Sequence, residues 1–452
     1  MNMYTVLIKL CLQTKEYFSH SHKIIFFVSL FFLAETQSSL FAEEKADSTL
    51  SSFSGSLRLS GEGEYMNLSD SMLNPSNILE RADKRAEAFV LGSALYKGFG
   101  GIFESEMRFS YQYTSGRSDA WFEKSFSKAQ VNQLYYQKKS ENISLLLGRK
   151  KIRWGVGYSY SPTDLISQLK NPEDPQDRLS LVKGADLFQA SFNNENNQID
   201  LAYVPEIEWN FDGLVIRNNR FAMRWYRFMD PFDLSLVGTV DDDGKWAAGM
   251  NTSVTYGNAL ELHAEYLYTS QNHKAYPNTN LDPSSFVMPY YLYRSGGVHD
   301  VVLGGQYTFE NNMNLTLEYL YRSSGYSNDI FKSYVNHISY LNDEYFLLSN
   351  PVFSLAGLNE SAMNFNMPLR NHYLFTRLYH PDVIQSISLE VYSYLSLGDG
   401  SGFFVFMPKY EKEKNYEVYL RLKKFWGKRN SEFGLVPDDF SAIVGVSYFL
   451  GN

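Results

Sequence analysis

Apolar and polar residues alternate with a period of two along almost the whole chain, and this alternation constrains the fold more than any other feature. The segments FESEMRFSYQYT (residues 103–114) and LELHAEYLYTS (residues 260–270) both place apolar and charged side chains at alternate positions. Successive side chains of a β-strand point to opposite faces, so each segment predicts a strand with one apolar and one charged face.

The length of these runs distinguishes a membrane barrel from a soluble sandwich. Sandwich strands also alternate, but they bury the apolar face and tend to be shorter. Many runs here reach about ten residues, the length that a tilted strand needs to cross a bilayer. We therefore predict an all-β fold: a transmembrane antiparallel β-barrel of about 18 strands (16–18), with short periplasmic turns and long extracellular loops.

Composition agrees with this fold class and excludes others. The chain is 16% aromatic and 20% charged, with a formal net charge of −9. A mean hydropathy of −0.31 excludes a helical membrane protein, whereas barrels are polar on average because only half of each strand meets lipid. The acidic balance and the lack of a basic stripe give no reason to expect nucleic-acid binding.

The N-terminus has the pattern of an export signal. Three lysines precede the apolar run IIFFVSLFFLA, and SSLFA–EEK offers a cleavage site after Ala42. The alternative is a single membrane anchor, which the short apolar run disfavours. The lone cysteine, Cys11, precedes the apolar run, which argues against a lipoprotein site. The predicted organisation has three parts: signal peptide 1–42, periplasmic leader 43–53 and outer-membrane barrel 54–452.

The connections between predicted strands alternate in length. Short turns fall at residues 97–101, 139–142, 193–197, 230–231, 256–259, 310–314, 380–382 and 411–414. Longer connections lie between them, at residues 67–84, 114–127, 155–183, 270–298, 323–368 and 427–440, and two more on the same side (241–244 and 398–402) are short. This alternation is typical of bacterial outer-membrane barrels and places both termini on the periplasmic side.

The polar face of each strand is expected to line a water-filled lumen. The predicted pore-lining residues are Arg58, Glu62, Glu64, Glu104, Glu106, Arg108, Arg224, Glu261, His263, Glu265, Glu318, Arg322, Arg377, Glu390, Glu417 and Arg421. Each of these charges has two interpretations: a partner in a wall-stabilising pair, or part of a charge ring that selects solutes. The two longest loops could fill or constrict the lumen, and the apolar stretch in 323–368 could form a short helix or pack inward.

One local motif carries a family resemblance. The fifth predicted strand leads into the segment LLLGRKKIRWGVGYSYSPTDLIS (residues 145–167), which contains, in order, Gly148, Arg149, Arg153, Trp154, Gly155, Pro162 and Asp164. This Gly-Arg, Trp-Gly and Pro-x-Asp pattern resembles the bacterial alginate-export and related porin-like barrels, as does the later segment with Arg370, Tyr373 and Phe375. The resemblance implies an outer-membrane barrel of about eighteen strands with a solute or polysaccharide pathway.

The same motif predicts a position at the membrane rim. Tryptophan is favoured at the membrane interface, and Pro162 and Asp164 suit the start of a folded loop. Arg149 and Arg153 have two possible roles, either contacting anionic headgroups or lining the lumen. An acidic polymer such as alginate would require a strongly basic lumen. Because the predicted lumen is mixed, a neutral sugar, a small cation or mixed nutrients fit at least as well.

Motifs for enzymatic or metal chemistry are missing from the sequence. It contains no Gly-x-Ser-x-Gly turn, no phosphate-binding loop and no His-Glu-x-x-His helix. His263 lies between Glu261 and Glu265 on one strand face, which more often gives a solvated histidine than a cation site. The acidic turn 241–244 supplies too few ligands for calcium. We therefore predict no catalytic residues, no metal and no cofactor.

Three functions remain open at this stage. The first is a passive channel in the bacterial outer membrane for a hydrophilic solute or saccharide, with selectivity set by inward Glu and Arg residues and by the loops. The second is a surface adhesion or interaction barrel with an occluded lumen, and the third is a barrel enzyme acting on lipid or surface polymer. Expected partners are outer-membrane lipid and lipopolysaccharide, the barrel-assembly machinery during biogenesis, and the solute itself.

Overall fold

A computed structural model describes residues 51–115, 125–205, 219–272, 274–278, 291–347, 351–365, 367–412 and 415–451. The predicted signal peptide and all but the last three residues of the predicted leader lie outside these ranges, so both stay predictions. The barrel begins at Ser52, two residues before the predicted start.

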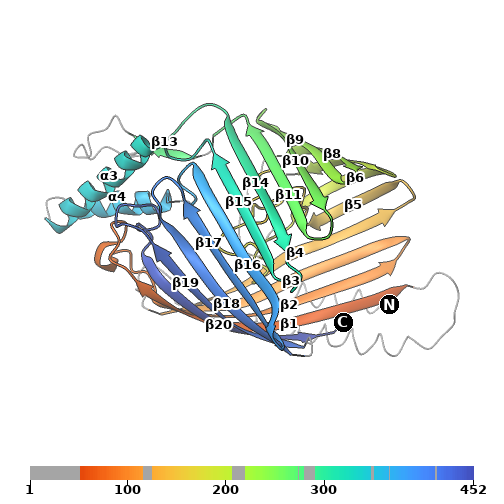
Figure 1. Cartoon of the computed structure of the whole chain (residues 1–452), viewed down its shortest axis with the longest axis horizontal. Helices are drawn as coiled ribbons and strands as arrows, with labels where there is room; N and C mark the ends of the chain where they lie inside the picture. The colour runs from red at the N-terminus through yellow and green to blue at the C-terminus, as the bar shows by residue number, and fades with distance from the viewer. Residues whose placement is uncertain are drawn as a thin grey trace, which may run out of the picture.

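Eighteen antiparallel strands form one sheet that closes on itself (Figure 1). They are β1 (Ser52–Leu68), β2 (Lys84–Gly98), β3 (Gly101–Thr114), β4 (Ser125–Lys139), β5 (Ile143–Lys150), β6 (Ala185–Asn194), β7 (Asn197–Val204), β8 (Arg220–Met229), β9 (Phe232–Asp241), β10 (Trp246–Tyr256), β11 (Leu260–Thr269), β14 (Val298–Thr308), β15 (Asn314–Arg322), β16 (His372–Ile384), β17 (Ile387–Ser396), β18 (Gly402–Lys412), β19 (Tyr416–Trp426) and β20 (Asp438–Leu450).

Pairing between the first and last strands closes the barrel. Each strand pairs with the next along the chain, and β1 also pairs with β20, from Leu57 opposite Leu450 to Tyr65 opposite Ala442. Closure leaves no unpaired sheet edge, which is what a strand structure in hydrocarbon requires. The predicted 18-strand antiparallel barrel is confirmed.

The alternation of the sequence becomes an apolar exterior and a polar interior. Leu317 on β15 is 49% exposed, whereas its neighbour Glu318 is 1% exposed. Leu201 and Asp200 on β7 show the same contrast, at 45% and 0%. The exposed apolar side chains form the outer surface that a bilayer would cover, and the polar side chains point into the lumen.

One predicted turn is displaced. We expected a turn at residues 380–382, but β16 continues to Ile384 and the turn follows before Ile387. The pairing between β16 and β17 shifts register between His380 and Ile384. Pro381 has no N–H to donate, so it interrupts the ladder inside an extended strand instead of ending the strand.

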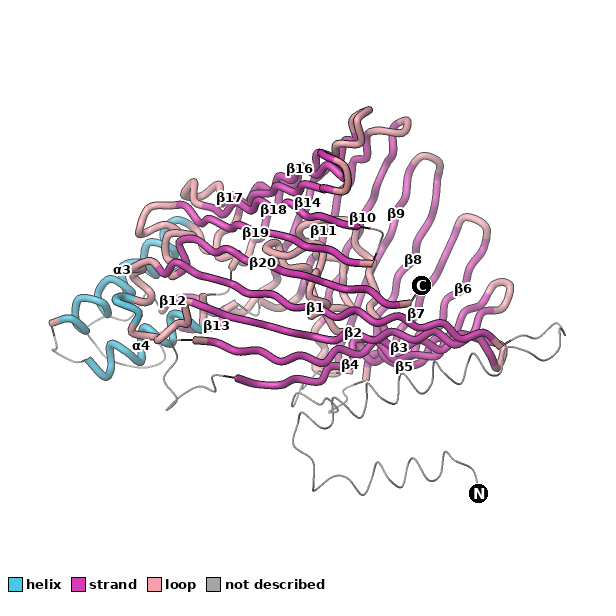
Figure 2. Tube along the Cα trace, turned by 90° about the horizontal axis from the view of Figure 1, so that it is seen from below, coloured by secondary structure: helices cyan, strands magenta, loops and turns pink. Residues whose placement is uncertain are grey.

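Long connections at one end of the barrel form a small cap. It contains the 3-10 turn η2 (Pro75–Asn77), the hairpin β12 (Ala275–Pro277) and β13 (Tyr291–Tyr293), and the helices α3 (Asn328–Phe346) and α4 (Pro351–Met363). Figure 2 shows both helices beyond one end of the barrel and β20 ending at the other. Tyr334, Ile338 and Leu358 of the helices share a buried cluster with Leu73 and Tyr276. The apolar stretch in 323–368 thus forms two helices of the cap, the first of the two alternatives that the sequence left open.

Among the described residues, no helix combines the length and the apolar character needed to cross a bilayer.

Candidate functional site

The connection between β5 and β6, residues 151–184, folds into the lumen, and we call it the pore loop. It contacts inward-facing side chains of strands spread around the wall: Asn251 on β10, Glu265 on β11, Glu318 on β15, Arg421 on β19 and Arg108 on β3. The loop therefore crosses the lumen from one side of the barrel to the other.

Glu265 anchors the first half of the pore loop. Its side chain is 2% exposed and its Oε1 accepts hydrogen bonds from the backbone N–H of Val156 at 2.6 Å and of Gly157 at 2.5 Å. Its Oε2 accepts from the backbone N–H and the hydroxyl of Thr163, at 3.0 and 2.7 Å. A buried carboxylate is tolerated when several donors satisfy it, and here those donors are loop backbone.

Glu318 provides a second anchor of the same kind. Its oxygens accept from the backbone N–H groups of Tyr158 and Ser159, at 2.5 and 2.8 Å, and from the Ser159 hydroxyl. His263 Nε2 lies 2.9 Å from Glu318 Oε1, so this histidine positions the anchor. Together Glu265 and Glu318 fix the direction of the loop across the lumen.

The Trp-Gly and Pro-x-Asp motif lies inside the barrel, so the predicted rim position is wrong. Asp164 Oδ1 accepts from the backbone N–H groups of Trp154 and Gly155, at 2.7 and 2.9 Å, which ties the two ends of a tight loop together. A Cβ on Gly155 would lie 1.6 Å from Ser161 Oγ, so only glycine fits there. Trp154 is 4% exposed and packs with inward-facing Ala222. Tryptophan suits a buried polar–apolar boundary as well as a membrane interface.

The arginines of the motif also pair with acidic side chains inside the barrel. Arg149 is 4% exposed and pairs through Nε and Nη2 with Asp186 of β6, at 2.9 and 2.6 Å. Arg153 donates to Asp164 Oδ2 at 3.0 Å within the pore loop. Of the two interpretations left open above, these contacts favour the lumen over lipid headgroups.

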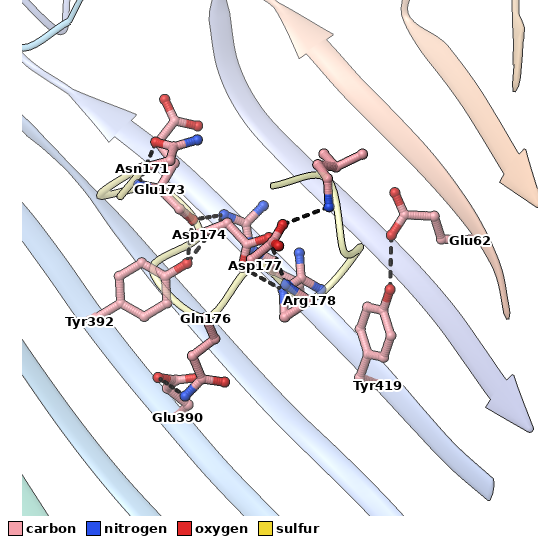
Figure 3. Close-up of polar contacts among 12 residues, drawn as sticks. Glu62, Asn171, Glu173, Asp174, Gln176, Asp177, Arg178, Glu390, Tyr392 and Tyr419 are labelled. Carbon is pink, nitrogen blue, oxygen red and sulfur yellow. Dashed lines mark hydrogen bonds and ion pairs between the residues drawn. The ribbon is translucent and has the colours of Figure 1, made fainter. Parts of the chain in front are cut away.

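The second half of the pore loop docks on β17, β19 and β1 (Figure 3). The Glu173 carbonyl accepts from Tyr392 Oη at 2.6 Å and from Arg421 Nη2 at 2.7 Å. The Glu173 carboxylate pairs with Lys423 at 2.8 Å. Arg178 lies over the Tyr419 ring and its carbonyl accepts from Arg58 at 2.9 Å. Charge-assisted contacts therefore hold this segment against the wall.

Acidic pH will loosen this docked segment. Burial alone would raise the pKa of Glu173, but the cationic groups of Lys423 and Arg421 hold it below the ordinary value of glutamate. The ionised carboxylate therefore stabilises the docked loop above the ordinary glutamate pKa, and this contribution is lost as pH falls through the lower value. The function proposed below makes this effect measurable: open-channel current noise should rise below about pH 4. Glu173→Gln has no ion pair with Lys423, so its current noise should rise less as the pH falls. Identical pH profiles of the noise in the two proteins would contradict this role of Glu173.

All the predicted pore-lining residues have contacts in the interior. Those that contact the pore loop are Arg58, Glu106, Arg108, Arg224, Glu265, Glu318, Arg322, Arg377, Glu390 and Arg421. The others contact wall residues: Glu62, Glu64, Glu104, Glu261, His263 and Glu417. Which of them a solute meets is a proposal, taken up below.

Sequence reasoning missed the loop residues that dock on the wall. Glu173, Asp174 and Arg178 belong to the stretch NPEDPQDR, which carries no strand alternation. Its prolines and charges are typical of a folded loop, but nothing local indicates that it reaches strands more than 200 residues away.

Two cavities lie on either side of this docked segment. The outer cavity, on the long-loop side, has a volume of about 510 Å³, and the inner cavity has a volume of about 380 Å³. Arg178 lines both of them, and Asp174 and Gln176 line one each. The docked segment 173–178 thus lies between an outer and an inner cavity.

Two kinds of chemistry can be checked in the interior: a metal site within the described ranges, and a serine nucleophile at Ser159. No group of three or more His, Cys, Asp or Glu side chains there is placed to hold a metal ion. The Ser159 hydroxyl donates to Glu318 at 2.5 Å, while His263 contacts a different oxygen of the same carboxylate. The serine therefore has no histidine base.

The closed 18-strand sheet, its apolar exterior and the loop folded into its lumen define a transmembrane β-barrel fold. No protein-family model matches the chain, and no curated protein matches it.

Solved structures match almost the whole chain. Pseudomonas aeruginosa OccK5 (OpdH) aligns with a TM-score of 0.53 at 11% identity, over 88% of this chain and 98% of that one. Acinetobacter baumannii OccAB1 aligns with a TM-score of 0.54 at 8% identity, over 91% and 99%. P. aeruginosa OccK8 (OprE) aligns with a TM-score of 0.53 at 8% identity, over 88% of this chain and 98% of that one. These likenesses concern the fold and do not extend to the alginate-export family.

Proposed function

We propose that the protein is a passive channel of the bacterial outer membrane for a hydrophilic solute or saccharide. One observation carries the proposal: a pore loop anchored inside the barrel leaves a cavity on each side of a charged constriction. A barrel of this size leaves an aqueous lumen unless loops fill it. The porin-like fold and the apolar exterior support the location, with outer-membrane lipid and lipopolysaccharide outside and the barrel-assembly machinery as the insertion route.

The constriction gives the channel its selectivity in this proposal. Solutes from the long-loop side would enter the outer cavity, pass Arg178 and reach the inner cavity. Charged side chains on both the loop and the wall face this route, so passage would depend on charge as well as size. No bound cofactor, energy source or nucleotide is needed for diffusion through such a route.

Liposome swelling tests the proposal. Vesicles that contain the refolded protein from Glu43 onward should swell in isosmotic small saccharides at rates that fall steeply with solute size. Vesicles with heat-unfolded protein provide the control. Swelling equal to that of protein-free vesicles for every solute would contradict a passive channel.

The surface-interaction function remains the second candidate because of one observation. Apolar side chains are exposed where α3 ends and α4 begins: Phe346 is 54% exposed, Leu347 71% and Val352 76%. Exposed apolar patches often mark interaction sites. If the barrel inserts but never conducts, this patch becomes the first place to look for function.

A further inference from the structure

The outer cavity is lined by acidic and basic side chains in equal number. The acidic ones are Glu62, Glu64, Glu173, Asp174 and Asp438, and the basic ones are Arg81, Arg85, Arg178, Arg421 and Lys423. The cavity therefore has no formal net charge, although its walls are highly polar.

Every basic side chain of this cavity already has an acidic or polar partner from the same wall. Arg81 pairs with Asp438 at 2.9 Å, and Arg85 pairs with both Glu62 and Glu64, at 3.4 and 3.0 Å. The remaining pairs join the pore loop to itself or to β19: Arg178 with Asp174, Lys423 with Glu173, and Arg421 with the Glu173 carbonyl. Four of the five cations are thus paired with carboxylates before any solute arrives, and Arg421 is bonded to a carbonyl.

These pairs are partly accessible from the cavity. The Arg81 side chain is 41% exposed and the Arg85 side chain 31%, while Glu173 retains 28% and Asp174 21%. Each pair presents an N–H donor beside a carboxylate acceptor. A hydroxyl donates one hydrogen bond and accepts one or two, so neighbouring hydroxyls match such pairs without breaking them.

Apolar residues also line the same cavity. Its lining includes Leu73, Leu79, Phe365, Phe425 and Val436. A sugar ring carries C–H groups on its faces and hydroxyls around its edge. Its hydroxyls would meet the charged pairs, and its C–H faces would meet the apolar residues. The volume of about 510 Å³ lies within the range of roughly 300–1,000 Å³ that is usual for small-molecule sites.

A solute with a net charge fits this lining less well. It would add an uncompensated charge to a cavity whose formal charges balance, and apart from Arg421 the charged side chains that it could contact are already paired with one another. A zwitterion would have to compete with the existing pairs at both of its ends.

We propose, on the basis of the channel function above, that the outer cavity is a binding site for a neutral polyhydroxylated solute, a mono- or disaccharide. The solute hydrogen-bonds to the exposed edges of the Arg81–Asp438, Arg85–Glu64 and Lys423–Glu173 pairs. Its C–H face packs on the apolar residues of the lining. Binding at this site precedes passage of the constriction at Arg178.

Block of the ion current by sugars of equal size and different charge tests the site. Glucose, glucosamine and glucuronate are added to the long-loop side, with glycylglycine as the zwitterion. We expect glucose to block at about tenfold lower concentration than the other three, a factor that corresponds to roughly 1.4 kcal/mol.

Two variants shift the charge balance in opposite directions. Asp438→Asn leaves Arg81 unpaired and should shift the preference toward glucuronate, whereas Arg81→Gln should shift it toward glucosamine. Asp200→Asn is the matched control, since Asp200 pairs with Arg224 at 2.7 Å and lines neither cavity. It should leave the order of block unchanged.

The outcomes separate this inference from the channel function. A conducting protein that is blocked best by glucuronate, glucosamine or glycylglycine, or by none of the four, would overturn the neutral-solute site and leave the channel intact. If one charge variant does not fold, the other still tests the predicted shift. A protein that inserts but carries no ion current would instead overturn the channel function.

Discussion

Replacing residues 158–179 of the pore loop by a short Gly-Ser linker will raise the single-channel conductance severalfold. This segment contains the constriction between the two cavities, and its removal leaves the lumen of an 18-strand barrel. A barrel of this strand number is wide enough to hold an aqueous channel without loop material. The measurement is the step size of the variant in a planar bilayer, compared with that of the intact chain.

A milder variant covers the case in which the shortened chain does not insert. Glu265→Ala with Glu318→Ala removes the carboxylates that accept from Val156, Tyr158 and Thr163, and hydrogen bonds to charged groups contribute roughly 1.5–3 kcal/mol each. We expect larger and noisier steps. Deletion of 329–361, in the cap helices, is the control and should change the step size far less. Unchanged steps in both pore-loop variants would contradict the assigned constriction.

Leu317→Arg will destabilise the barrel by about 2–4 kcal/mol, the usual cost of a cation near the bilayer midplane on a lipid-facing strand. Leu317 lies in the middle of β15 and is 49% exposed on the outer surface. The free energy of unfolding, measured by denaturant titration in lipid vesicles, gives the effect directly.

Tyr307→Arg is the matched control for depth. Tyr307 also faces outward, is 41% exposed and lies near the end of β14. The cost near the membrane interface falls to roughly 0–1 kcal/mol. The fold requires the two positions to lie at different depths in the bilayer. Equal losses of unfolding free energy for the Leu317 and Tyr307 variants would contradict this.

The wall of the barrel was predictable because strand alternation is a local property. The sequence pair Leu317–Glu318 already indicates one outward and one inward side chain, and repetition of such pairs predicts strand number and sidedness. The single misplaced turn, near Pro381, arose because a proline inside a strand resembles a proline in a turn.

The interior was much less predictable, because its contacts join distant parts of the chain. Val156 and Glu265 are 109 residues apart, and Glu173 and Lys423 are 250 apart. Nothing near Trp154 distinguishes a tryptophan that enters the lumen from one at the rim, since both environments favour an amphipathic ring. The sequence pattern indicates which charged side chains point inward, but their partners required the structure.

Charge compensation in the lumen also bears on the cargo. The mixed signs noted in the sequence become specific pairs in the structure, such as Arg58 with Glu417 and Arg85 with Glu64. Pairs of this kind stabilise the barrel and at the same time leave the route without a dominant sign. An acidic polymer would gain little from such a lining.

Single-channel recording of the refolded chain from Glu43, in a planar bilayer under a salt gradient, tests the central claim most directly. We predict stable open steps with a reversal potential close to zero, because the outer cavity is lined by five acidic and five basic side chains and the inner cavity by three and four. A barrel that is folded by heat-modifiability on a gel but carries no current would contradict the channel. It would direct the search for function to the exposed ends of α3 and α4.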